Sequence, residues 1–162
     1  MTNGLPANYV MRSGSGLDRA LLVKFMQRTY QELYPEHNFA HLAQTVERYF
    51  SADTPLWWVY NQTESQATAT TPIACLWMGN AVDQVWGDRH AYIFLLYVCP
   101  EFRRAGIGSA LMQQAEVWAK QRGDRRIGLQ VFYHNQPALH LYEKLGYQIQ
   151  SIWMMKPLKQ GD

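Results

Sequence analysis

A run of nine consecutive apolar residues, from Ala91 to Cys99, constrains the fold of this chain more than any other feature of the sequence. A helix that crosses a bilayer needs about 20 apolar residues, so this run is too short to span a membrane. A strand with one face in water alternates apolar and polar side chains, whereas a strand buried on both faces is apolar throughout. The stretch Ala91–Val98 is therefore predicted to be a central strand covered on both faces.

Composition limits the class of protein. With 48% apolar and 17% charged residues among 162, the chain is not intrinsically disordered, and its length predicts one domain, placed over residues 8–160. The net charge of +2 argues against a nucleic-acid or membrane-surface partner. The 10 Tyr, 6 Trp and 6 Phe hint at an aromatic-lined pocket.

The N-terminal residues and the two cysteines predict a compartment. Residues 1–10 hold no basic patch followed by an apolar stretch, so no secretory signal is expected. Cys75 and Cys99 lack the spacing of a disulfide framework or a zinc site. We therefore expect two reduced thiols in a cytoplasmic protein.

Strand and helix patterns alternate along the chain. Ser15 and Asp18 form a capping box ahead of apolar residues at helical spacing, and Pro35 ends that helix. The order β-α-α-β-β-β-α-β-α-β predicts an α/β (α+β) fold with a mixed, mostly antiparallel central sheet flanked by helices. The expected elements are a strand over 8–12, helices over 15–34 and 38–50, strands over 56–60, 73–78 and 91–98, a helix over 106–122, a strand over 127–131, a helix over 135–145 and a last strand over 147–158, with a surface loop over 61–72.

The turn after the central strand carries two arginines and two glycines, in Arg103-Arg104-Ala105-Gly106-Ile107-Gly108-Ser109. The glycines let a ligand approach the backbone, and the first amides of the following helix point outward at the positive end of its dipole. This predicts an anion site of pyrophosphate size. A plain strand–helix turn with solvated arginines is the alternative. Leu111 stands where a dinucleotide fingerprint needs glycine, and the spacing also excludes a P-loop.

The same residues resemble a known family. Arg103-x-x-Gly106-x-Gly108, after a strand ending in Val98-Cys99-Pro100-Glu101, resembles the acetyl-coenzyme A motif of the GNAT superfamily of N-acetyltransferases. A second family signature follows over Asn135–Tyr147, and the ending Met155–Leu158 is similar to the family's last strand. The resemblance implies a GNAT-like fold, acetyl-CoA as co-substrate and no metal. It also implies acetyl transfer to a primary amine of a small molecule or protein by direct attack in a ternary complex.

The resemblance implies where the coenzyme binds. Its pyrophosphate would lie on the turn, mostly on main-chain amides, and its pantetheine arm would pair with the end of the preceding strand. Asn135 contacts the arm in the family, and it also fits the N-cap of a helix. The implied cofactor-binding residues are Leu96, Val98, Arg103, Arg104, Ala105, Gly106, Ile107, Gly108, Ser109 and Asn135.

Tyr142 holds the position of the family's general acid, which gives its proton to the departing thiolate; a packed core tyrosine is the alternative. Thiol and phenol pKa values of about 8.5 and 10 allow that transfer. Many relatives also place a glutamate base early in the central strand, but Ala91–Val98 holds no carboxylate. The general base is therefore not assigned to one group. The candidates are a water and six nearby side chains, namely Glu32, Glu36, His37, Asp83, Asp88 and His90.

A non-catalytic acyl-CoA-binding sensor or regulatory module with the same fold is the second function considered. Tyr142 favours the enzyme, whereas the missing carboxylate favours the sensor. His37 and His41 have the spacing of zinc ligands but lack a third ligand. Trp86, in a polar stretch between two strands, is the aromatic residue expected to line a pocket, where it would receive a cationic amine. The expected partner is an amine acceptor, and a homodimer is left open.

Overall fold

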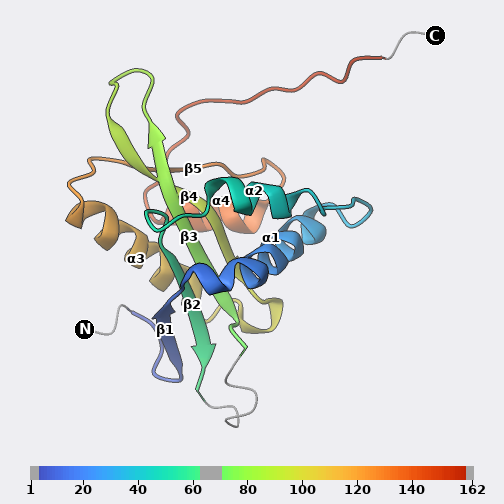
Figure 1. Ribbon diagram of the computed structural model, residues 1–162. Coiled ribbons are helices and arrows are strands. Elements are labelled where there is room, and N and C mark those ends of the chain that lie inside the picture. The colour runs from blue at the N-terminus through green and yellow to red at the C-terminus, as the bar shows by residue number, and fades with distance from the viewer. Residues whose placement is uncertain (1–3, 63–70, 160–162) are drawn as a thin grey trace. The chain divides into compact units, whose positions relative to one another are not determined.

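The computed structural model describes residues 4–62 and 71–159 (Figure 1). Most of the predicted surface loop over 61–72 lies outside these residues. By its contacts the chain divides after Gln130 into two compact units. The elements are β1 (Tyr9–Ser13), α1 (Arg19–Leu33), α2 (Leu42–Tyr49), β2 (Leu56–Asn61), β3 (Ala74–Val82), β4 (Arg89–Val98), α3 (Ile107–Gln121), β5 (Ile127–Leu129) and α4 (Gln136–Lys144), with short 3-10 helices η1 (Gly16–Asp18) and η2 (Pro100–Phe102).

One sheet organises the first unit. Its strands lie in the order β1-β2-β3-β4-β5; the first three pairings are antiparallel and the β4–β5 pairing is parallel. Buried and half-buried side chains alternate along β4 from Ala91 to Val98, so both faces of this strand are covered, as its apolar composition predicts. The expected mixed, mostly antiparallel sheet is confirmed.

Helices cover the two faces of this sheet (Figure 1). The predicted capping box is present, since the Ser15 amide donates to the Asp18 carboxylate at 2.6 Å. On α1, Phe25 lies edge-on to the rings of Trp58 (5.1 Å) and Tyr97 (5.6 Å), and this contact anchors α1 to the sheet. The buried face of α3 is rich in alanine, which lets this helix approach β3 and β4 closely.

A β-bulge interrupts the β3–β4 pairing. Trp77 pairs with Leu95 but Met78 pairs with Ile93, so Phe94 is an extra residue on β4. Because of the bulge, two consecutive residues of β4 contact the core beneath α1 and α2. Leu95 belongs to this core, and Phe94 packs against it. The bulge also lies where the pairing with β5 ends, at Ile93.

Gly79 makes room for the ring of the bulge residue. A Cβ at Gly79 would lie 2.0 Å from the Phe94 ring, and this ring is already packed at 4.6 Å against Trp77. We expect Gly79→Ala to lower the free energy of unfolding by about 1–3 kcal/mol because it overpacks this site. Thermal denaturation measures the effect, and adding Phe94→Leu should recover part of it. An alanine variant as stable as the parent protein would contradict this packing.

Three predicted elements differ from the structure. The strand predicted over 73–78 continues to Val82 as β3, where it pairs with the start of β4. The second helix begins at Leu42 and not at Asn38, because the Asn38 side chain accepts a hydrogen bond from the Ala40 amide (2.8 Å) and forms a local turn instead. The last strand, predicted over 147–158, is not formed. A strand needs a partner, and the described residues from Val131 onward contain only α4 as regular structure.

The second unit therefore consists of α4 and an extended segment. Gly146, with φ +90°, ends α4 as predicted. Beyond it, large apolar side chains are exposed: Ile149, Ile152, Trp153, Met154, Met155 and Leu158. A single domain over residues 8–160 stays a prediction.

Candidate functional site

The turn between β4 and α3 exposes the start of a helix. Arg104 (φ +63°) and Gly106 (φ +82°) both adopt left-handed backbone, which reverses the chain within a few residues. The Gly106 carbonyl accepts the first helical bond, from Ala110 at 3.0 Å, and no side chain caps the helix. The amides of Ile107, Gly108 and Ser109 thus have no helical acceptor, and the helix dipole favours an anion there.

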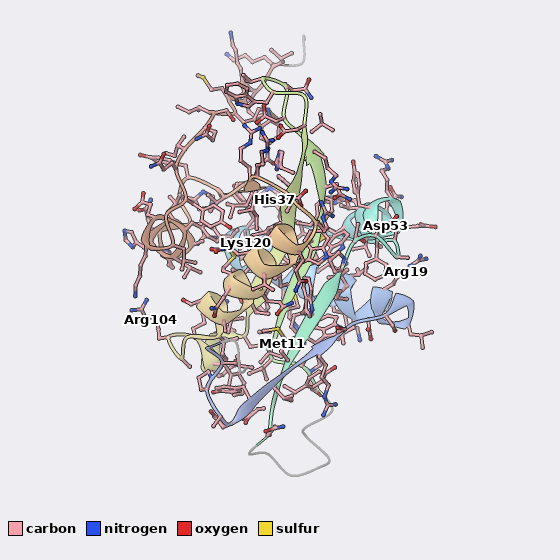
Figure 2. All side chains as sticks on the ribbon, turned by 90° about the vertical axis from the view of Figure 1, so that its left-hand side faces the viewer. Met11, Arg19, His37, Asp53, Arg104 and Lys120 are labelled. Atoms are coloured by element: carbon pink, nitrogen blue, oxygen red, sulfur yellow. The ribbon has the colours of Figure 1, made fainter. Side chains whose placement is uncertain are left out.

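The two arginines of the turn have different surroundings. Arg103 donates from Nε to the Val98 carbonyl (2.8 Å) and from a terminal nitrogen to Glu32 (2.6 Å), and it lies 5.6 Å from the Tyr97 ring. Arg103 thereby fastens the end of β4 to α1. Arg104 is exposed, and Figure 2 shows it projecting away from the turn. The sequence predicted both arginines as anion ligands, and of the two only Arg104 has no side-chain partner among the described residues.

We expect alanine substitutions of the two arginines to affect different properties of the protein. Arg103→Ala should destabilise the free protein by about 1–2 kcal/mol, because it removes a hydrogen bond and an ion pair from β4 and α1. Arg104→Ala should leave the melting temperature unchanged but weaken acetyl-CoA binding about tenfold, since one charged phosphate contact is lost. Thermal denaturation and titration calorimetry measure the two effects, and the reverse pattern would contradict these roles.

Glu32, one of the base candidates, is fully engaged. Its second oxygen accepts a 2.5 Å hydrogen bond from the Tyr97 hydroxyl. Burial, together with the Glu32 carboxylate, raises the pKa of Tyr97 well above its ordinary value. Each Glu32 oxygen thus accepts one hydrogen bond, and the carboxylate is held between Tyr97 and Arg103. The link joins residues 65 and 71 positions apart in the sequence, and no local pattern predicts it.

Past its bulge, β4 presents a backbone edge that β5 does not pair and on which Arg103 binds the Val98 carbonyl. Among the described residues β5 pairs with β4 only as far as Ile93. The Cys99 amide donates to Ile73 on the β3 side (2.8 Å), so by alternation the amides of Leu96 and Val98 point toward the opposite, unpaired side. An extended chain bearing amides can pair with such an edge as an added strand. From Val98 back to Phe94 is four strand steps, about 13 Å.

The sequence of residues 21–147, most of the chain, matches the acetyltransferase (GNAT) family. The chain belongs to the GNAT family.

This GNAT chain is similar to other acetyltransferases in sequence and in fold. An uncharacterized N-acetyltransferase of Bacillus subtilis (strain 168), YdgE, is 32% identical over 82 residues, 51% of this chain and 52% of the relative, so the chain spans about half of that protein. An aminoglycoside N(6')-acetyltransferase type 1 of Acinetobacter baumannii is 28% identical over 118 residues, 71% of this chain and 77% of its own. A crystal structure of a predicted acetyltransferase with acetyl-CoA from Clostridium acetobutylicum matches with a TM-score of 0.72 at 22% identity, over 92% of this chain and 96% of its own.

The second GNAT signature lies on α4. Asn135 occupies the N-cap position, but its side chain makes no capping hydrogen bond, contrary to the capping role predicted from the sequence. Its backbone carbonyl accepts from Leu139 (3.1 Å) and starts the helix, and Pro137 lies in the first turn. The Asn135 amide group is therefore not used by the helix.

Tyr142 is half-buried on the same helix, with its ring 5.8 Å from that of Tyr147. Burial raises the pKa of Tyr142 to about 12. The hydroxyl therefore carries its proton throughout the physiological range, as a proton donor must.

The other base candidates are not gathered at one point. Asp83 and Asp88 both pair with Arg126, and backbone amides at Trp86 and Val85 hold the pKa of Asp83 below its ordinary value. His90 contacts the Ala91 carbonyl through Nδ1 at 2.9 Å. Glu36 and His37 are exposed beyond the end of α1. The described residues thus single out no base.

Two hollows mark the surface of the first unit. The larger, about 780 Å³, is lined by Trp86 as expected, together with residues of the α3–β5 turn, but Arg126 already lies 5.7 Å from the Trp86 ring. The smaller hollow, about 430 Å³, is lined by Gln27, Gln31, His37, Asn38, Phe39 and Ala40.

The described part of the chain contains no group of three His, Cys, Asp or Glu side chains placed to hold a metal ion. None of the helices described is both long and apolar enough to cross a bilayer.

Proposed function

We propose that this GNAT protein transfers the acetyl group of acetyl-CoA to a primary amine of a small molecule or a protein, by direct attack of the amine in a ternary complex. The observation that carries the proposal is the unpaired edge of β4, which runs from Val98, where the chain enters the turn before α3, back to the bulge at Phe94. Family membership and the neighbour described with acetyl-CoA support the same assignment.

The coenzyme would bind along this edge. Its pyrophosphate would accept hydrogen bonds from the amides of Ile107, Gly108 and Ser109, with Ala105 and Gly106 shaping the turn and Arg104 adding charge. Its pantetheine arm would pair with Leu96 and Val98 as an added strand and bring the thioester toward Phe94. Arg103 would act by positioning the end of β4, and Asn135 would contact the arm with the amide group that its helix does not use.

The chemistry then needs two proton movements. The neutral amine attacks the thioester carbonyl; the C–N bond forms, the C–S bond breaks, and the thiolate leaves. Tyr142 would protonate the thiolate and regain its proton from solvent. A desolvated thiolate also has a raised pKa, so a tyrosine with a pKa of about 12 remains a feasible donor. A water or a group of the flanking loops, but no side chain of β4, would take the proton of the amine.

A non-catalytic acyl-CoA sensor is the second candidate, because β4 carries no carboxylate and Glu32 is engaged by Arg103 and Tyr97. Release of free thiol from acetyl-CoA in the presence of a panel of amines separates the two. The enzyme should release thiol only when an acceptor is present, whereas a sensor should bind acetyl-CoA and release none.

We also expect a cytoplasmic enzyme. Its two cysteines are both free, and Cys75 is fully buried, which suits a reducing compartment. A homodimer remains open.

A further inference from the structure

The acceptor amine must reach the carbonyl carbon of the thioester, and the geometry of β4 limits where this can occur. If the arm pairs with Val98 and Leu96, its reactive end lies near the bulge at Phe94, where the β5 pairing stops. The side chains around the bulge on the α1/α2 face therefore form the surface that an incoming amine meets.

That surface is aromatic. The Phe94 ring lies 5.5 Å from Tyr92 on β4 and 5.6 Å from Tyr49 on α2. Tyr30 on α1 is close enough to Tyr92 to influence its ionisation, and its own ring lies 5.6 Å from Phe39. All five rings are partly exposed. These residues, Tyr30, Phe39, Tyr49, Tyr92 and Phe94, are called the aromatic band below.

The band continues into a hollow that no carboxylate lines. The 430 Å³ hollow includes Phe39 and His37, and its polar lining consists of the amides of Gln27, Gln31 and Asn38, without a carboxylate. The Gln27 amide nitrogen donates to the Phe39 carbonyl (3.3 Å), so the side chain holds Phe39 in place.

The charges around the band do not favour a polycation. Of the carboxylates in residues 18–50, Glu32 is paired with Arg103, while Glu36 and Glu47 are exposed to water. Residues 18–50, which supply α1 and α2, carry equal numbers of acidic and basic side chains: Asp18, Glu32, Glu36 and Glu47 against Arg19, Lys24, Arg28 and Arg48.

We propose that the acceptor is an aromatic or otherwise apolar amine with a single basic nitrogen, bound on the aromatic band, and not a polycation such as an aminoglycoside. This rests on the proposed acetyltransferase function. Ring faces attract one cation and bury apolar surface, whereas several ammonium groups need several unpaired carboxylates. The substrate class in the name of the Acinetobacter baumannii relative, which is 28% identical, would thus not transfer to this chain.

Two probe amines test the proposal with the full chain, acetyl-CoA and a thiol-release assay at constant ionic strength. The value of kcat/KM for 2-phenylethylamine should exceed that for tobramycin at least 100-fold. An equal or higher value for tobramycin would overturn the proposed class of acceptor. The proposed class of acceptor would also be overturned if neither amine were acetylated while acetyl-CoA still raised the melting temperature of the protein. If acetyl-CoA did not raise the melting temperature at all, the proposed acetyltransferase function itself would be contradicted.

A charge variant tests whether the preference for an apolar amine depends on the aromatic band. Tyr49 is 47% exposed, so Tyr49→Glu should fold while adding a carboxylate beside Phe94. It should lower the ratio of the two kcat/KM values at least tenfold in favour of tobramycin. The matched control is Leu17→Glu, because Leu17 is 95% exposed and lies in η1, ahead of the first residue of α1, whereas Tyr30 lies in the last turn of α1. An equal change in both variants would refute the assignment to the band.

Discussion

Replacing Tyr142 with Phe should lower turnover by about 10²- to 10⁴-fold, the range over which a general acid contributes. The ring and its contact with Tyr147 remain, so the melting temperature and the affinity for acetyl-CoA should hardly change. Only the proton source for the departing thiolate is lost. Steady-state kinetics with saturating acetyl-CoA measure the effect.

The pH profile adds a second readout for Tyr142. A group with a raised pKa is protonated below that pKa, and Tyr142, at about 12, keeps its proton until the pH rises toward that value. Any alkaline fall in rate below pH 10 must therefore come from another group. Tyr133→Phe is the matched control, since this tyrosine is 86% exposed. Near-normal turnover in Tyr142→Phe would leave Tyr142 as a packing residue.

Replacing Gly108 with Val should abolish binding of acetyl-CoA. Gly108 is the second residue of α3, and a branched side chain there would occupy the space through which an anion reaches the first helical amides. At 100 times its dissociation constant, a ligand stabilises the fold by about 2.7 kcal/mol, roughly 5–11 °C in melting temperature for a chain of this size. This shift should be present in the parent protein and absent in the variant.

Gly16→Val provides the matched control for that experiment. A Cβ at Gly16 meets nothing within 4 Å, so the same substitution there adds a similar side chain without crowding. The control should retain the full shift. If Gly108→Val also retains it, the coenzyme does not use this helix start.

Local patterns in the sequence predict most of the fold and the turn of the site. The central strand, the capping box at Ser15 and the glycines at 106 and 123 act within a few residues, so their sequence positions suffice. They also place the turn over residues 103–109 between a strand and a helix, as the structure has it.

What the sequence did not predict depends on distant contacts or on a competing local bond. The bulge at Phe94 arises from the register of two strands. Arg103 was expected to face a ligand, because its actual partner Glu32 lies on a distant element that the local sequence does not reveal. The late start of α2 reflects a side-chain hydrogen bond at Asn38 that competes with the helix. The aromatic band likewise gathers side chains from two helices and a strand, which no periodicity reveals.

Glu32 and Tyr30 lie two residues apart on α1, and the helix therefore touches both halves of the proposed reaction. Glu32 holds Arg103 at the turn where we propose that the coenzyme binds, while Tyr30 belongs to the band assigned to the amine. A shift of this helix on binding one substrate would alter the contact offered to the other. The two binding equilibria would then be thermodynamically linked, and each substrate would change the affinity of the other by the same factor.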